Sequence, residues 1–150
     1  MRSTYRVLAY AIPVLVAVQA SMIAFGFFGL NSWVGDGHDY TKSVSDSGNG
    51  VTGSSGLSIH AINGTMIIPL VAIVLLIISF FAKIPGGSKW AGYILLDVVV
   101  QIALAFVAFG VPGIGILHGL NAFVLAGLGF TAAARVNRVT AAAEPEMAAN

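Results

Sequence analysis

Apolar residues follow one another in four long runs along this chain, and polar residues gather between the runs. The runs lie near residues 7–30, 57–82, 90–111 and 114–134. Each run has about 20 residues or more, which at a rise of about 1.5 Å per residue is enough to cross a hydrocarbon layer of roughly 30 Å. We therefore predict an all-α, polytopic membrane protein whose four transmembrane helices form one domain over residues 1–136.

The segments outside the runs have compositions that do not build a folded core. Residues 31–56 are rich in Gly, Ser, Asn and Asp, so they bury little apolar area to offset the backbone entropy that folding costs. We expect a flexible loop there and a tail without fixed structure over residues 137–150. The first run is longer than the apolar part of a typical signal peptide, so we expect the first helix to be retained rather than cleaved.

Composition favours a membrane protein and excludes several other classes. Hydrophobic residues make up 57% of the 150 residues and charged residues only 9%, whereas an average soluble domain is about a quarter charged. The net charge of +1 and the lack of a basic cluster argue against nucleic-acid binding. The chain has no cysteine, which excludes a disulfide framework, a thiolate metal site and covalent haem attachment through a CxxCH motif.

The basic residues indicate how the helices are oriented. Six of the seven lie at matching ends of the four runs: Arg2, Arg6, Lys83, Lys89, Arg135 and Arg138. The positive-inside rule assigns these ends to the cytoplasm, so we expect both termini inside and the loop 31–56 outside. We expect a multi-pass protein of the bacterial plasma membrane, with the lipid bilayer as one partner and another membrane subunit or a redox protein as a second.

A short polar pattern recurs in alternate runs. The second and fourth runs each carry His-x-x-Asn near their outer ends, at His60 and Asn63 and again at His118 and Asn121. The first and third runs each carry a mid-span glutamine after a valine, at Gln19 and Gln101. This order favours two duplicated helix hairpins, and it predicts an up-down-up-down four-helix bundle.

The two histidines predict a metal centre. In such a bundle the second and fourth helices lie diagonally, roughly 13 Å apart, which suits two imidazoles that reach one haem iron from opposite sides. Asn63 and Asn121 are candidates to bond the imidazoles or a haem propionate. We therefore predict that His60 and His118 are the iron ligands of haem b in a protein that transfers electrons or senses redox state.

A second hypothesis needs no cofactor. Asn, Gln and His side chains within membrane helices also serve as hydrogen bonds between helices, each contributing about 0.6–2 kcal/mol. On this interpretation the chain is a membrane scaffold or an accessory subunit. The sequence contains no motif of a hydrolase or transferase, so nothing in it indicates an enzyme.

Two further titratable residues have more than one interpretation. Asp97 lies inside the third run, where a charged side chain costs about 2.5–3.5 kcal/mol, so we expect it to face the bundle interior and to be neutral or paired. As a packed, protonated acid it would bond Gln101, four residues on, Tyr93 or a hydroxyl of the first span; a proton relay or an ion site is the alternative. His38 lies among acids in the outer loop, where it is either a metal ligand or a solvated side chain.

The paired motif also carries a resemblance to known proteins. The segments from His60 to Gly64 and from His118 to Ala122 resemble those of a family of uncharacterised small four-helix membrane proteins from actinobacteria, which implies a fold and no activity. Paired histidines on alternate helices are more distantly similar to the four-helix haem cores of b-type membrane cytochromes and haem A synthases. The chain lacks the glutamate that the resemblance to a haem A synthase would require within a span, which argues against that enzyme.

Overall fold

The computed structural model describes the backbone of residues 1–148 and the side chains of residues 1–136. Its elements in chain order are α1 (Arg2–Gly35), α2 (Lys42–Ser47), α3 (Ser54–Ile62), η1 (Asn63–Ile67), α4 (Ile68–Ser79), α5 (Gly87–Gly110) and α6 (Ile114–Ala148). The element η1 is a π-helical turn that joins α3 and α4 into one continuous helix. No strand occurs in the described residues.

Four of these helices are long and apolar enough to cross a membrane. They are α1, the continuous helix from α3 to α4, α5, and the part of α6 up to Val136. This confirms the predicted all-α membrane protein with four spans. The helical backbone of α6 continues past the predicted fourth span to Ala148. The predicted unstructured tail, residues 137–150, lies outside the residues whose side chains the structure describes.

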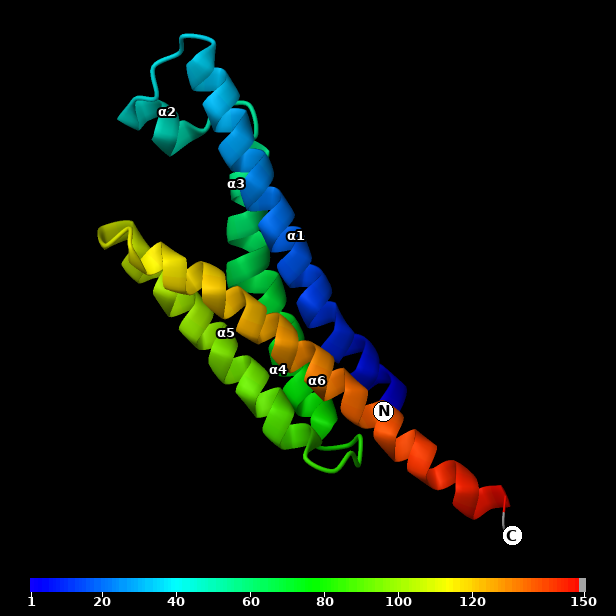
Figure 1. Ribbon diagram of the computed structural model, residues 1–150. Helices are drawn as coiled ribbons and strands as arrows, with labels where there is room; N and C mark the ends of the chain where they lie inside the picture. Colours follow the sequence, from blue (N-terminus) through cyan, green and yellow to red (C-terminus); the bar gives the residue numbers. More distant parts are fainter. Residues whose placement is uncertain (149–150) are drawn as a thin grey trace.

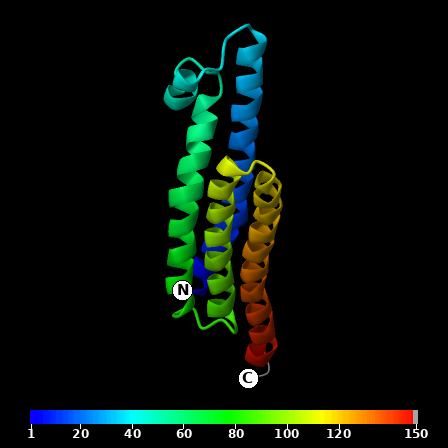
Figure 2. The ribbon, with the colours of Figure 1, turned by 90° about the vertical axis from the view of Figure 1, so that its left-hand side faces the viewer.

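Consecutive long helices run in opposite directions and pack as two hairpins. In Figures 1 and 2 the start of α1, the loop 80–86 and the C-terminal part of α6 lie towards one end, and the segment 36–53 and the turn 111–113 close the opposite ends of the two hairpins, with the turn 111–113 well below the segment 36–53 in Figure 2. Helix α1 packs against α3, α4 and α6, and α5 packs against α4 and α6. Helix α6 is therefore diagonal to the continuous helix that carries α3 and α4.

The apolar core occupies only the half of the bundle near the chain ends. Its largest fully buried side chains come from all four spans and include Tyr5, Ile12, Leu75, Ile94 and Leu125. The hydroxyl of Tyr5 donates a hydrogen bond of 3.0 Å to the carbonyl of Gly87, which holds the start of α1 against the start of α5.

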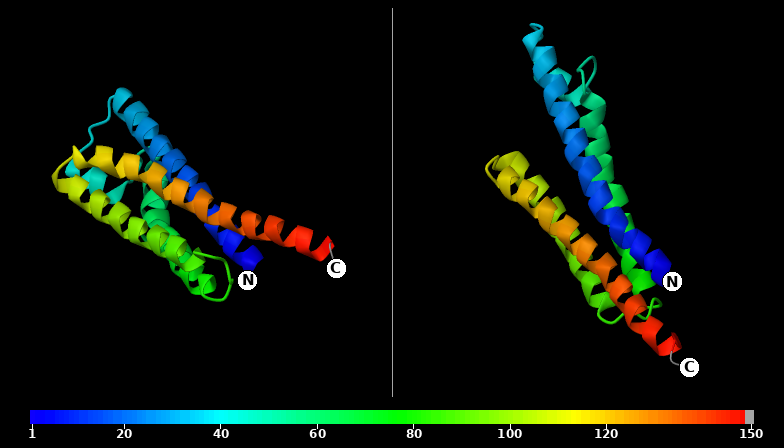
Figure 3. Two further views of the ribbon diagram at one scale, coloured as in Figure 1. Left: turned by 60° about the horizontal axis from the view of Figure 1, so that its bottom comes forward. Right: turned by 45° about the vertical axis from the view of Figure 1, so that its right-hand side comes forward.

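Towards the other end the two hairpins diverge (Figure 3, right). Helix α3 packs on α1 and makes at most marginal contact with α5 and α6 in the described residues. The two helices of the first hairpin instead approach each other at glycines. A Cβ added at Gly53 would lie 2.6 Å from the Phe25 carbonyl oxygen, and one added at Gly56 would lie 2.6 Å from the Met22 carbonyl oxygen. No larger residue fits at either glycine, so the backbones of α1 and α3 approach each other closely there.

Part of the segment expected to be a loop is helical. Helix α1 continues to Gly35, and α2 forms a short helix within the segment. The Thr41 hydroxyl accepts a hydrogen bond from the Val44 N–H, and Lys42 and Asp46 form an ion pair of 2.8 Å one turn apart. Gly48 ends the helix in the left-handed conformation. These local signals are present in the sequence, although the high Gly and Ser content obscures them.

Candidate functional site

The two histidines of the repeated pattern meet where the hairpins begin to diverge. His60 lies on α3, eight residues before the core residue Ile68, and His118 lies on α6, seven residues before the core residue Leu125. Their ring centres are 6.3 Å apart, and the ring planes are inclined by 62°. The diagonal helices therefore bring together the residues that the sequence analysis paired.

Each histidine is held by the glutamine of its own hairpin through the same kind of contact. His60 Nδ1 lies 3.2 Å from the main-chain carbonyl oxygen of Gln19, and His118 Nδ1 lies 3.0 Å from that of Gln101. A carbonyl oxygen can only accept, so each Nδ1 must carry a proton and donate it. In the neutral imidazole this leaves the lone pair on Nε2, which is the arrangement found in histidines that bind metals.

In the second hairpin a network of side chains surrounds this contact. The amide nitrogen of Gln101 donates to the His118 carbonyl oxygen at 3.0 Å and lies 3.4 Å from His118 Nε2. The amide of Asn121 donates to the Gln101 side-chain oxygen at 2.8 Å. Gln101 is thus fixed at both ends of its amide, and it bonds both the ring and the backbone of His118.

The first hairpin lacks such a network. The amide of Asn63 donates to the main-chain carbonyl of Leu15 at 3.3 Å. The amide nitrogen of Gln19 lies against Gly64, where an added Cβ would collide with it. The side-chain oxygens of Gln19 and Asn63 have no hydrogen-bond partner among the described residues. Neither asparagine amide bonds an imidazole here, because each donates to the neighbouring helix of its hairpin; the alternative, a bond to a haem propionate, stays a prediction.

A π-helical turn directly follows the first histidine motif. It begins at Asn63, whose carbonyl oxygen accepts from the N–H of Ile68, five residues on. Pro69 follows and has no N–H to donate, which disturbs the regular bonding of the preceding turn. Turns of this kind often occur at functional sites. Proline at position 69 was the available sequence signal, but it predicts a disturbed helix rather than this particular turn.

Asp97 is connected to the same network, although not as expected. It lies one turn before Gln101 on α5, and its carboxyl interacts with the Asn121 side chain on α6. Its Oδ2 has no partner among the described residues. The expected bond to Gln101 is replaced because the Gln101 amide is already engaged by His118 and Asn121.

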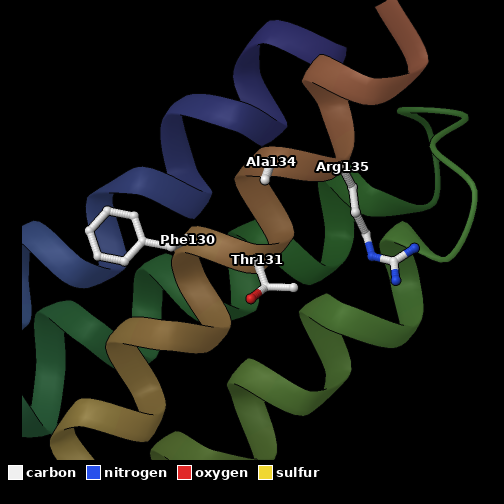
Figure 4. A pocket seen from close by; sticks show the side chains of 4 residues that line it. All are labelled: Phe130, Thr131, Ala134 and Arg135. Atoms are coloured by element: carbon white, nitrogen blue, oxygen red, sulfur yellow. The ribbon is translucent and has the colours of Figure 1, made fainter. Parts of the chain in front are cut away.

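The remaining candidates lie apart from the histidine pair. His38 stacks on Trp33, with ring centres 4.7 Å apart, and its Nδ1 contacts the Trp33 carbonyl oxygen at 2.9 Å. Figure 4 shows a hollow on α6 lined by Phe130, Thr131, Ala134 and Arg135, in which the Arg135 side chain points towards the loop 80–86. None of these four residues belongs to the repeated pattern.

No protein-family model, curated protein or solved structure matches the chain. The fold and the site define a multi-pass helical membrane protein with two facing histidines. Its function must be argued from that site.

We predict that Asp97→Asn leaves the protein folded. A neutral carboxyl and an amide have nearly the same shape, and hydrogen bonds between membrane helices average only about 0.6 kcal/mol, so the free energy of unfolding should change by less than about 1 kcal/mol. Asp97→Leu is the matched variant: it leaves Asn121 without this partner, which should cost about 1–2 kcal/mol. Unfolding of both variants in detergent measures the difference. A much larger loss in Asp97→Asn would show that the carboxylate is charged and paired.

Proposed function

We propose that this chain is a small membrane haem b protein, in which His60 and His118 are the two iron ligands and which transfers electrons or senses redox state. One observation carries the proposal: both histidines contact the main-chain carbonyl of the corresponding glutamine through Nδ1, which leaves Nε2 of each neutral ring without a proton, and the two ring centres lie 6.3 Å apart. Bound there, haem b supplies a one-electron couple between ferric and ferrous iron.

The spacing of the rings supports an iron between them. Two imidazoles that bind one metal from opposite sides, each through Nε2 at about 2 Å, have ring centres roughly 6 Å apart. The observed separation is 6.3 Å. Gln101 lies 3.4 Å from His118 Nε2, but its amide has a better acceptor in the His118 carbonyl at 3.0 Å, so it can release the ring nitrogen.

The surroundings also favour haem over a bare metal ion. Among the described residues no group of three or more His, Asp or Glu side chains could hold an ion. A haem iron needs only two protein ligands, because the porphyrin supplies the other four nitrogens. Helix α3 scarcely contacts α5 and α6 in the described residues. Gly129 leaves no space for a cofactor, since Pro13 and Ala9 of α1 lie against it.

The second candidate function is a scaffold or accessory subunit without a cofactor. It is favoured by the network around Gln101, which partly satisfies His118 without any metal. On this account the histidines and amides hold helices together, as polar side chains in membrane helices commonly do.

The absorption spectrum separates the two candidates. Protein purified from haem-replete cells should show a Soret band that sharpens on reduction with dithionite, the behaviour of iron with two imidazole ligands. Either His60→Ala or His118→Ala should abolish this two-histidine spectrum, because one ligand is lost. His38→Ala is the matched control and should leave the spectrum unchanged, since His38 is stacked on Trp33 in the outer segment. A colourless wild-type protein would favour the scaffold.

We further propose that the two hairpins are duplicates and that they lie in the bacterial plasma membrane with both termini in the cytoplasm. The duplication is supported by the two equivalent contacts between histidine and glutamine. The orientation is supported by the basic residues near one end of the bundle, where the Arg135 guanidinium donates to the Pro85 carbonyl at 3.4 Å and lies over the Trp90 ring. Membership of the actinobacterial family, and a membrane or redox partner, stay predictions.

Cysteine labelling tests the orientation. A cysteine introduced at Ser47, in α2, should react with an impermeant reagent outside intact cells. One at Ser88, beside the loop 80–86, should react only after the cells are opened, because the positive-inside rule places that loop in the cytoplasm. The opposite pattern of labelling would contradict the orientation.

A further inference from the structure

We infer that the end of the bundle near the chain termini binds an anionic phospholipid, with the lipid phosphate at Arg135 and an acyl chain in the hollow on α6. The inference rests on the membrane location of the four spans and is independent of the haem proposal. It starts from the charges at this end of the bundle and from the place of the hollow.

Basic side chains gather at this end, whereas the acidic side chains that the structure describes lie elsewhere. Three of the acids belong to the outer segment 36–53, and Asp97 lies in the middle of α5. The salt bridge seen in the described residues, between Lys42 and Asp46, is also in the outer segment. The basic residues near the chain termini include Arg2, Lys83, Lys89 and Arg135. Within the described residues this end therefore has a net positive charge, which attracts anionic lipid headgroups.

The contacts of these side chains leave their charge in place. The Arg135 guanidinium donates to the Pro85 carbonyl at 3.4 Å and lies 4.9 Å from the centre of the Trp90 ring, and the Lys89 ammonium lies 5.6 Å from the centre of the Tyr93 ring. Carbonyls and rings are neutral partners. The bond to Pro85 is long, and Nε of Arg135 has no hydrogen-bond partner among the described residues. A phosphate oxygen is a stronger acceptor than either partner of Arg135, because it is charged.

The hollow beside Arg135 suits an acyl chain. Its lining consists of Phe130, Thr131, Ala134 and Arg135. In Figure 4 the side chains of Phe130 and Arg135 point to opposite sides, and the two smaller residues lie between them. The Thr131 hydroxyl donates to the Gly127 carbonyl of its own helix at 2.8 Å, so it is already paired. Apart from the guanidinium, the hollow therefore offers mainly apolar contact.

The hollow also lies at the depth that a phospholipid requires. The fourth span ends at Val136, so Arg135 lies at the edge of the span, beside a tryptophan, a residue type that gathers at membrane surfaces. Phe130 lies five residues deeper, which is about 7.5 Å along the helix. A charged group at the surface with an apolar surface below it matches a phosphate with its acyl chain. A free phosphate ion would use only the first of these features.

The two tryptophans of the chain allow a test at a defined place. Trp90 lies next to Arg135, whereas Trp33 lies near the outer end of α1. In bilayers of phosphatidylcholine and phosphatidylglycerol, bromine on the acyl chains of one lipid quenches the fluorescence of a tryptophan beside which that lipid binds. In Trp33→Phe, where Trp90 reports alone, we expect phosphatidylglycerol to bind at least about fivefold more tightly than phosphatidylcholine. In Trp90→Phe, where Trp33 reports, we expect no such preference.

Variants in the Trp33→Phe protein separate the charge from the hollow. Arg135→Gln should remove most of the preference, and the matched variant Lys42→Gln should keep it, since Lys42 is paired with Asp46 in the outer segment. Ala134→Leu fills the hollow and should weaken the binding of phosphatidylglycerol, whereas Ala103→Leu, the same change at an exposed position of α5, should not. Sodium chloride at about 1 M should also reduce the preference without any change of residue, because salt screens the contact with the phosphate.

Several results would overturn the inference. They are equal binding of the two lipids beside Trp90, a preference that survives both Arg135→Gln and high salt, and a preference of the same size beside Trp33. Loss of the preference on adding millimolar inorganic phosphate would show that the site takes a phosphate ion and not a lipid. None of these measurements depends on a Soret band, so failure of the lipid site and failure of the haem proposal are distinguishable.

Discussion

The hydrogen bond from a histidine Nδ1 to the backbone of the facing helix is the interaction on which the site depends. Within a membrane span there is little water to satisfy an imidazole, so the ring must find its partner on a neighbouring helix. In both hairpins that partner is the main-chain carbonyl of a glutamine, Gln19 or Gln101. The bond sets the register of the two helices in each hairpin. It also sets the tautomer, because the nitrogen that donates cannot keep the lone pair. In each neutral ring Nε2 is therefore the nitrogen that keeps the lone pair.

The packing of the bundle decides where that space lies. Near the chain ends the four spans share an apolar core, and residues such as Leu75 and Ile94 are fully buried. Beyond the histidines the two helices of the first hairpin approach each other at Gly53 and Gly56. There they make little contact with the second hairpin. The rings thus lie at the edge of the common core, where the two hairpins begin to diverge. A core that continued along the whole bundle would fill this position with apolar side chains, and a flat cofactor could not lie between the histidines.

Much of this arrangement is predictable from the sequence, and the limits have physical reasons. The four spans follow from hydropathy alone, because a hydrocarbon layer demands long apolar helices. The polar residues within the spans are conspicuous, because burying a polar side chain in a membrane costs free energy and such residues rarely occur without a role. They are His60, His118, Gln19 and Gln101. The interaction of Asp97 with Asn121 was not predictable, since it depends on the packing of α5 on α6. The turn η1 and the difference between the two hairpins likewise depend on contacts between distant segments, although the two motifs look alike in sequence.

Electron paramagnetic resonance of the oxidised protein tests the central claim most directly, because it reports the ligands of the iron themselves. If His60 and His118 bind one iron through Nε2, the wild-type protein has a low-spin ferric signal of the kind given by two imidazole ligands. The same signal should be replaced by a high-spin signal in His60→Ala. A wild-type protein with only a high-spin signal, or with no haem signal, would contradict the claim that the facing histidines share an iron.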